Sequence, residues 1–401
     1  MPSDDDRVSL VRCEDYAPEQ VAAAVRRAVD LLGGLDRFIS PGQRVLVKPN
    51  LLQPVAPDEC VTTHPEMVTA VARMLRDHGC EVVIADSAGG GTPYTEARLR
   101  KLYDITGMSG AAEAAGAELG LDATYREVAC PEGRVIKRFQ VITPAAEADA
   151  IVVVSKAKTH VLTAMTGATK CIFGVLPGME KPSFHGRLPD LEGFCDMLLD
   201  LNLAMRPELQ IMDAVMGMEG DGPSGGEPRR IGAVLAAADP VALDIVAAGL
   251  MGFRAEDLPT IRRAAERGMA PDGLRVKVVG EEPGSLTVTD FKHSSSTAAS
   301  KLGVGAPVLG RLLRAYALRP VVSKERCNGC GRCARSCPRE TIRVVRGKAR
   351  ISHGRCIRCY CCHEMCENRA IELRRSTGGR FIARIMEGRN ARSDLSPDEQ
   401  S

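Results

Sequence analysis

The chain has 401 residues and a mass of 42.9 kDa, enough for at least two domains. Its formal charge of +2 and its 3% of aromatic residues, with no tryptophan, argue against nucleic acid or an anionic membrane as a partner. No stretch approaches the length of a membrane-spanning helix, and the first ten residues lack the pattern of a secretion signal, so we expect a cytoplasmic protein. Abundant Ala, Arg and Gly favour a bacterial source. Fifteen cysteines in such a protein indicate metal ligation or reactive thiols, not disulfides.

Strand and helix patterns alternate through the first 290 residues. Strands are expected at 7–13, 44–50, 81–91, 148–160, within 207–228, within 231–253 and at 274–280. Helices are expected at 18–34, 63–80, 194–205 and from about 239 onward, with Thr63 or His64 as the cap of the second helix. This rhythm predicts an α/β fold, with a mostly parallel sheet and helices on both of its faces.

The composition changes toward the C-terminus, where the stretch from His293 to Ser300 has the character of a linker. We therefore divide the chain into an α/β domain at 1–290, a linker at 291–320, a small cysteine-rich α+β domain at 321–376 and a flexible tail at 377–401. Two β-runs around Gly347 and Lys348 predict a hairpin inside the cysteine-rich domain.

The cysteine-rich domain holds two copies of the pattern C-x2-C-x2-C-x3-C. The spacing is that of bacterial-type ferredoxins with two [4Fe–4S] clusters, in which the fourth cysteine of each copy ligates the other cluster. One expected ligand set is Cys327, Cys330, Cys333 and Cys366, and the other is Cys356, Cys359, Cys362 and Cys337. The alternative is zinc, which usually takes separated C-x2-C pairs and fits this spacing poorly.

The module departs from the ferredoxin pattern at Glu367, where proline is common, and adds an extra thiol at Cys361, which we read as a packed or exposed spare. Residues 321–376 carry 14 Lys and Arg against five Asp and Glu, which leaves the module at +9 and the rest of the chain at −7. This charge would let the module dock on the acidic body, or on an acidic external donor such as ferredoxin or flavodoxin. The alternative is that its arginines are simply solvated.

A set of distinctive stretches spans most of residues 45–253: "VLVKPN", "TTHPEMVTAVARMLRDHG", "VVIADSAGG", "SKAKTH", "TGATKCIFGVLPG", "FHGRLPD", "DLN", "IMDAVMGMEGDGPSGG" and "ADPVALDIVAAGLMGF". On these stretches the body resembles a known family, the domain of unknown function numbered 362. The resemblance implies an α/β cytoplasmic protein with redox chemistry where the cysteines are present. The family usually shows Lys-Asn where this chain has Lys170 and Cys171, so a contact made by that asparagine would be changed here.

Polar side chains follow several predicted strands. Because ligands of an open parallel sheet bind beyond the carboxyl ends of its strands, we expect these loops to converge on one pocket. The candidate substrate-binding residues are Lys48, Asn50, His64, Asp86, Cys171, Glu219 and Asp221. The candidate catalytic residues are Lys156, Lys158 and Lys170, which would polarise a carbonyl or carboxylate, and His160 and His185, which would donate a proton.

Alternation along a strand places Lys156 and Lys158 on one face together with His160, which predicts a cationic row. The alternative is that these lysines are solvated or form structural ion pairs. His64 is either a helix cap or a catalytic residue.

The acidic pair Glu219 and Asp221 sits in a glycine-rich stretch. These carboxylates either bind a divalent metal or form the solvated tip of a mobile lid. The glycines at 89–91 lack the spacing of a phosphate-binding loop.

These features favour an iron–sulfur reductase that passes single electrons from an external carrier to an organic substrate, a conjugated or aromatic carbonyl compound. No flavin or nicotinamide fingerprint is present. The alternatives are an electron-transfer or assembly subunit whose catalytic partner is another protein, and a sensor or structural use of the clusters. The sequence leaves an oligomer open.

Overall fold

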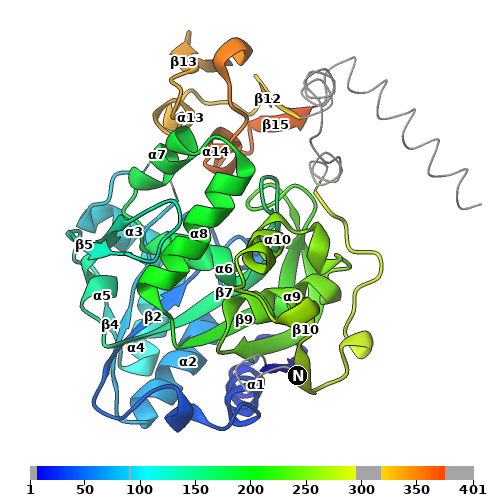
Figure 1. The fold of residues 1–401 in the computed structure, drawn as a ribbon. Helices are drawn as coiled ribbons and strands as arrows, with labels where there is room; N and C mark the ends of the chain where they lie inside the picture. The colour runs from blue at the N-terminus through cyan, green and yellow to red at the C-terminus, as the bar shows by residue number, and fades with distance from the viewer. Residues whose placement is uncertain (1–6, 90–91, 295–317, 375–401) are drawn as a thin grey trace, which may run out of the picture.

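The computed structural model describes residues 7–89, 92–294 and 318–374. Figure 1 shows an α/β body with a small module at one end of it. The expected tail at 377–401 and most of the expected linker at 291–320 lie outside the described residues. Of the linker's ends, Phe291 is buried in the core of the body, and Leu318 packs against the module residue Tyr360.

A single sheet runs through the body in the order β11-β1-β10-β9-β7-β2-β3-β4. Strands β9, β7, β2, β3 and β4 are parallel to one another, whereas β10 is antiparallel to both β9 and β1. The strands are β1 (Arg7–Arg12), β2 (Arg44–Pro49), β3 (Glu81–Ile84), β4 (Glu118–Leu119), β7 (Ala150–His160), β9 (Leu209–Glu219), β10 (Glu227–Ala237) and β11 (Lys277–Gly280). The short strand β8 (Ala164–Met165) pairs with the end of β7, and β5 (Tyr125–Ala129) and β6 (Arg138–Ile142) form a separate hairpin.

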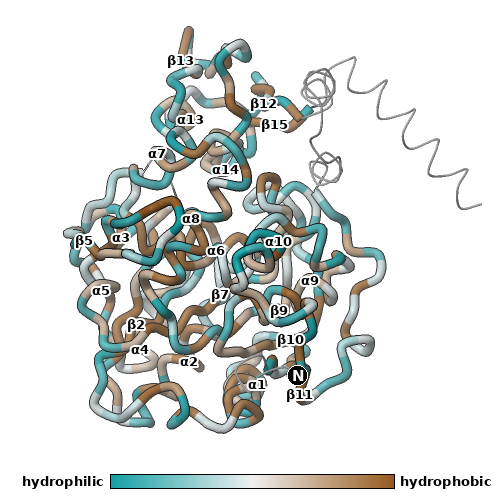
Figure 2. Tube along the Cα trace, viewed as in Figure 1, coloured by the Kyte–Doolittle hydropathy of each residue, from teal (hydrophilic) through white to brown (hydrophobic). Residues whose placement is uncertain are grey.

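Helices cover both faces of this sheet, so the predicted fold class is confirmed. They are α1 (Pro18–Asp30), α2 (Pro65–Asp77), α3 (Glu96–Ile105), α4 (Met108–Ala115), α5 (Thr143–Ala146), α6 (Gly167–Cys171), α7 (Glu180–Arg187), α8 (Leu191–Met205), α9 (Pro240–Leu250) and α10 (Pro259–Glu266). Alternation in β2 shows the two layers: Val45 and Val47 join the core under α1 and α2, while Leu46 joins the core under α8. Figure 2 shows hydrophobic stretches running through the body between polar outer turns.

The helices α2, α8 and α9 begin at residues whose side chains cap them. Asp190 and Asp239 accept hydrogen bonds from backbone N–H groups in the first turns of α8 and α9. The His64 Nδ1 accepts from Glu66 N at the start of α2, so the expected capping contact is present. The elements that the sequence reading did not anticipate are short: α3 to α7, α10, β4 to β6 and β8.

The module contains two pairs of strands and two single-turn helices. β12 (Arg319–Val322) pairs with β15 (Ile371–Arg374), and β13 (Ile342–Val345) pairs with β14 (Lys348–Ile351) in the expected hairpin. The helices α13 (Arg332–Arg335) and α14 (Cys361–Glu364) contain the third cysteine of each motif, Cys333 and Cys362.

Helix α14 is the part of the module that rests on the body (Figure 1). The Glu364 carbonyl oxygen accepts hydrogen bonds from Gln53 Nε2 and from Ser224 Oγ, the latter at 3.0 Å. His363 Nε2 lies 3.3 Å from the carbonyl oxygen of Asp221. At the rim of this contact, Arg369 forms an ion pair with Glu59 of the body. The module therefore docks on the body, chiefly through polar contacts.

Candidate functional site

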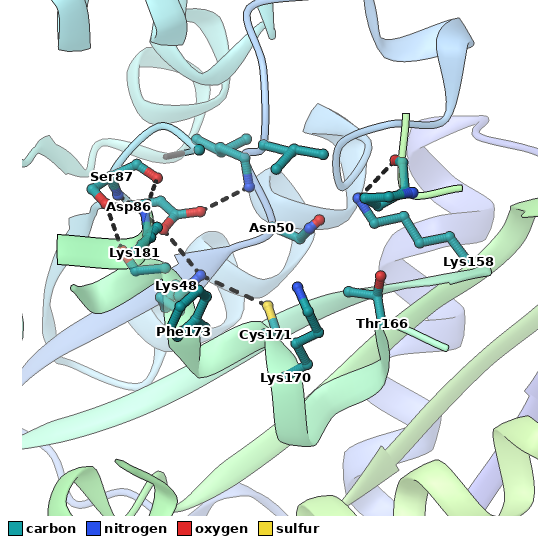
Figure 3. A pocket seen from close by; sticks show the side chains of 15 residues that line it. Lys48, Asn50, Asp86, Ser87, Lys158, Thr166, Lys170, Cys171, Phe173 and Lys181 are labelled. Atoms are coloured by element: carbon teal, nitrogen blue, oxygen red, sulfur yellow. Dashed lines mark hydrogen bonds and ion pairs between the residues drawn. The ribbon is translucent and has the colours of Figure 1, made fainter. Parts of the chain in front are cut away.

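A pocket opens where β2, β3 and β7 end, close to the docked module. It encloses about 410 Å³, including its open mouth. Its polar lining consists of Lys48, Asn50, Asp86, Ser87, Lys158, Thr166, Lys170, Cys171 and Lys181. Four lysines thus face one space that has a single lining carboxylate, and we call this space the lysine pocket (Figure 3).

The positive charge of the Lys48 ammonium is paired with a buried carboxylate. Its Nζ lies 3.1 Å from Asp86 Oδ1 and donates to the Pro49 carbonyl at 2.7 Å, with Cys171 Sγ at 3.7 Å. The other oxygen of Asp86 accepts from the Leu51 N–H at 2.7 Å. This buried pair joins the end of β2 to the end of β3 and forms the floor of the pocket.

Lys181 reaches the pocket from α7. Its Nζ donates to the carbonyl oxygens of Ser87 and Ala88 at 3.1 and 2.8 Å, and also to the Ser87 hydroxyl. Burial lowers the pKa of Lys181 to about 7, although Asp86 opposes the shift.

Lys158 is held by two carbonyl groups from different loops. Its Nζ donates to Val61 at 2.6 Å and to Pro223 at 3.4 Å. Burial lowers its pKa to about 7, and the positive charge of Lys170 lowers it further. An ammonium group that titrates near neutrality can donate a proton during turnover.

Lys170 has no hydrogen-bond acceptor among the residues that the structure describes, and its Nζ lies 5.7 Å from the centre of the Phe173 ring. In Figure 3 its side chain points into the space toward Asn50. Burial lowers its pKa, while the carboxylate of Glu364 opposes that shift. The buried Asn50 Oδ1 and Thr166 Oγ1 also lack partners within the described ranges. Unpartnered buried polar atoms are rare in proteins, so these two oxygens beside the Lys170 ammonium suit a polar ligand.

The expected cationic row along β7 is not formed. The pairing of β7 with β9 shifts register between Lys156 and Lys158, and a bulge of this kind redirects side chains. Lys156 Nζ instead binds Asp213 Oδ2 at 2.7 Å and the Tyr16 hydroxyl at 2.8 Å. The His64 ring stacks on Tyr16 at 3.6 Å, and burial lowers its pKa to about 4. Lys156 and His64 therefore belong to a separate buried network outside the pocket.

His160 contacts the module and does not line the pocket. Its Nδ1 accepts from the N–H groups of Leu162 and Thr163, at 3.0 and 3.4 Å. The neutral ring therefore carries its proton on Nε2, which lies 3.3 Å from Glu364 Oε1. Burial, with Lys170 and Lys158 nearby, holds the pKa of His160 well below its usual range, so the ring stays neutral.

His185 also lies outside the pocket. Its ring stacks on Phe194 at 4.3 Å and meets the edge of Phe173 at 6.2 Å. Burial lowers its pKa to about 3.

The glycine-rich loop after β9 does not have a solvated acidic tip. Glu219 is only 3% exposed, and its carboxylate accepts from the Lys292 N–H at 3.0 Å and lies 3.3 Å from Lys292 Nζ. Asp221 accepts from the Ser294 hydroxyl at 3.0 Å. Within 7–89, 92–294 and 318–374 no three His, Cys, Asp or Glu side chains are arranged to hold a single metal ion. The loop packs against the module, because a Cβ on Gly225 would meet the His363 ring at 2.8 Å.

The cysteines of the module surround two cavities. The cysteines that line the first are Cys327, Cys330, Cys333 and Cys366, and those that line the second are Cys337, Cys356, Cys359 and Cys362. The two groups are the crossed sets expected from the spacing. Burial raises the pKa of Cys333 to about 11, and the thiols of Cys366, Cys330 and Cys327 raise it further, as expected for four thiols that face one another. The extra thiol Cys361 is buried between the second set and the body.

The sequence reading missed three residues of this region. Lys181 is joined to Ser87, Thr166 lines the pocket, and Glu364 faces His160 from the module. Ser87 lies in a polar stretch after a predicted strand, but nothing in the spacing of Lys181 or Glu364 points to a pocket.

Comparison with known proteins agrees with this architecture. The family described as Domain of unknown function (DUF362) matches residues 45–249, and a 4Fe-4S binding domain matches residues 320–343. A thylakoid-associated protein of Synechocystis sp. is 30% identical over 292 residues, which are 71% of this chain and 87% of that protein. The chain therefore belongs to the DUF362 family and carries an iron–sulfur electron-transfer domain. No described helix is long and apolar enough to cross a membrane.

Other similarities are partial. A subunit of DNA-directed RNA polymerase from Methanosarcina mazei is 39% identical over 57 residues, or 14% of this chain and 21% of that subunit. The lactate racemase apoprotein from Thermoanaerobacterium thermosaccharolyticum aligns with a TM-score of 0.38 at 12% identity, and a Thermotoga maritima protein aligns with 0.34 at 14%. These alignments cover 61% and 55% of this chain, and 56% and 55% of those chains.

The lysine pocket should bind small anions more weakly as pH rises. The lowered pKa values, about 7 for both Lys158 and Lys181, mean that these ammonium groups are charged below pH 7 and neutral above it. Calorimetric titration with benzoate should show affinity falling by up to about tenfold per pH unit above pH 7 for each proton coupled to binding. In Lys158→Met the fall should be shallower. A benzoate affinity that stays constant from about pH 6 to about pH 9 would contradict this assignment.

Proposed function

We propose that this member of the DUF362 family is an iron–sulfur reductase, in which an external carrier protein supplies electrons for the reduction of a small anionic carbonyl compound in the lysine pocket. One observation carries the proposal. Helix α14 contains a cysteine of the second cavity, Cys362, and its Glu364 carbonyl oxygen accepts a hydrogen bond from Ser224, the neighbour of the pocket residue Pro223. Groups that bind a redox centre and groups that bind an anion therefore lie on either side of one helical turn.

The cysteine sets suit two [4Fe–4S] clusters. Each cavity is lined by four thiols and by mostly apolar neighbours, which is the donor set that such clusters require. When bound, the clusters would supply electrons one at a time. Backbone N–H groups help to hold the thiolates: Ala349 N donates to Cys327 Sγ, Thr341 N to Cys337 Sγ and Ala370 N to Cys366 Sγ, at 3.4, 3.3 and 3.2 Å.

The pocket suits a substrate with a carboxylate and a conjugated carbonyl. Lys48 has its own carboxylate partner, but the charge of Lys170 has no hydrogen-bond acceptor in the described parts of the chain. An anionic substrate would provide that acceptor, and Asn50 and Thr166 offer further polar contacts. As electron density builds on the carbonyl oxygen, a fixed cation in a water-poor space stabilises it more than solvent does. Conjugation allows the carbonyl to accept one electron at a time.

Protons complete the reaction. Two electrons from the carrier and two protons convert a conjugated carbonyl compound to its dihydro product. Lys158 is the better placed donor, since its pKa is about 7 and it lines the pocket, and solvent re-protonates it after each turnover. His160 and His185 remain neutral and outside the pocket lining. We therefore assign proton donation to a lysine.

Electrons would enter at the outer end of the module. Cys330 is the exposed member of its set, whereas α14 faces the body. The exposed arginines of the module that form no ion pair within the described ranges are Arg335, Arg339, Arg343, Arg346, Arg350 and Arg355. Val344 and Val345 are also exposed, and Figure 2 shows β13 as a hydrophobic stretch projecting from the module. A basic surface with a small apolar centre fits an acidic one-electron carrier such as ferredoxin or flavodoxin.

The exposed valines also favour the second candidate, an electron-transfer subunit that docks on a catalytic partner. The two functions differ in what reoxidises the reduced chain. A reductase transfers its electrons to a small molecule, whereas a subunit requires the partner protein.

Cysteine substitutions test the cluster assignment. The anaerobically purified chain should contain roughly eight irons and give interacting S = 1/2 EPR signals after dithionite reduction. Cys366→Ser and Cys337→Ser should each lose about half of the iron, since each thiol belongs to a different cavity. Cys361→Ser, the matched control, should keep the full content. Zinc in place of iron in the wild-type chain would contradict the assignment.

Lys170 tests the substrate site. The dithionite-reduced chain, freed of excess reductant, is mixed with conjugated and aromatic carbonyl acids such as phenylpyruvate and cinnamate, and the loss of the EPR signal is followed. Lys170→Met should slow reoxidation by the best compound about 100-fold or more, because it removes the unpartnered cation. The exposed Lys277→Met on β11 should react like wild type. If no compound is active and a protein fraction alone reoxidises the chain, the subunit function replaces the reductase.

The carrier surface predicts a salt-dependent reduction rate. Reduction by an acidic ferredoxin should slow as ionic strength rises, because screening weakens long-range attraction. The double variant Arg343→Glu, Arg346→Glu should lower the second-order rate about tenfold or more at low salt. Arg26→Glu on α1, at the far end of the body, should leave it unchanged. A rate that is insensitive to both salt and the double variant places the docking surface elsewhere.

A further inference from the structure

A second cavity lies on the other side of α6 from the lysine pocket. It is bounded by α6, the end of α8, the start of α9 and the segment after α10, and encloses about 750 Å³ including its mouth. We call it the α6 cavity. Its apolar lining consists of Leu199, Leu203, Pro207, Ala238, Pro240, Val241 and Met269. It shares no lining residue with the lysine pocket, although Thr169 in one wall and Lys170 in the other are neighbours on α6.

One wall of the α6 cavity presents an unpartnered acceptor. Asn202 Nδ2 donates to the carbonyl oxygens of Thr169 and Leu198, each at 2.8 Å. Because both partners can only accept, the orientation of the amide is determined and its oxygen is turned the other way. Asn202 is 8% exposed, lines the cavity, and its Oδ1 has no donor among the described residues.

A further buried polar group lies nearby without partners. Thr169, in the same wall of the cavity, is 1% exposed, and its side chain lies beside the carboxylate of Asp244. Gln210 on β9 is equally buried, and neither polar atom of its amide has a partner in the described ranges. Since Ile211 belongs to the core under α1 and Met212 to the core under α9, alternation turns Gln210 toward the face of the sheet that α6 covers. Buried polar atoms of this kind normally have partners, so their grouping here indicates a missing ligand or water.

We propose that the α6 cavity is a second small-molecule site, which binds an uncharged and largely apolar compound bearing a hydroxyl or N–H group. The apolar side chains enclose its body, its donor binds Asn202 Oδ1, and Thr169 Oγ1 is within the same lining. A charged ligand is disfavoured, because the two charged lining residues already have partners. Arg206 is 74% exposed and pairs with Glu132 at 3.7 Å, and Asp239 caps α9. This site is independent of the reductase proposal.

Two aromatic probes that differ by one hydroxyl group test the site. The oxidised holoprotein with methyl-labelled methionine is titrated with p-cresol and with toluene, and the Met269 signal is assigned through Met269→Leu. We expect p-cresol to shift that signal in a saturable way. Its affinity should be roughly 3- to 10-fold above that of toluene, because its hydroxyl group gains one hydrogen bond. Equal affinities would overturn the assignment of Asn202. No saturable shift at Met269 would mean that the cavity holds water only, and would overturn the site.

Filling the cavity gives the second test. Val241→Phe and, from the partly exposed edge, Met269→Trp should each abolish calorimetric binding of p-cresol. Each variant is accepted only if its unfolding temperature is near that of wild type and its lysine pocket still binds benzoate. Met269→Trp should disturb the fold less than Val241→Phe, because it replaces a partly exposed side chain and not a buried one. A folded Met269→Trp that binds p-cresol like wild type would place the site elsewhere.

Discussion

The body has to keep four lysine side chains around one small space that has a single lining carboxylate. Like charges in a water-poor site repel one another, and each buried ammonium loses its hydration. The chain meets this constraint largely with backbone carbonyl groups: Lys158 is held by Val61 and Pro223, and Lys181 by Ser87 and Ala88. These carbonyls belong to the loops after β2, β3 and β9, so the lysines also fix the positions of those loops. Only Lys170 is left without an acceptor in the described structure, which is why the chemistry centres on it.

The close packing that this arrangement requires accounts for two glycines. A Cβ on Gly174 would lie 2.0 Å from Asp86 Oδ1 and 2.4 Å from Lys48 Nζ, so any larger residue would separate the buried pair. A Cβ on Gly89 would lie 2.6 Å from the Leu52 carbonyl oxygen and 2.8 Å from Met365 Sδ of the module. The second contact shows that the loop after β3 is shaped for the docked module as well as for the pocket. The pocket and the contact with the module thus both require close packing in the same short loops.

Periodicity and spacing predicted those features that are set by residues close together in the chain. The long strands, the capped helices and the crossed cysteine sets all follow patterns that repeat over a few positions, and β7 and α9 are found where those patterns indicate. Lys156 and Lys158 could not be distinguished, because alternation treats them alike and the difference arises from a register shift against β9. Lys181 lies on a short helix with little periodicity, and Glu364 acts on a part of the chain about 200 residues away. Such residues depend on tertiary packing that no local pattern encodes.

Helix α14 has a consequence for how the protein matures. A four-residue helix has too few internal hydrogen bonds to persist by itself, and five of the twelve side chains in the small core beside it are cysteines. Metal ligation is therefore a source of order for this helix. Glu364 contacts the body only when this helix is formed. Docking of the module would therefore require iron in addition to synthesis of the chain. Cells short of iron would accumulate a folded body without a docked module, and restoring iron would complete existing chains without new translation.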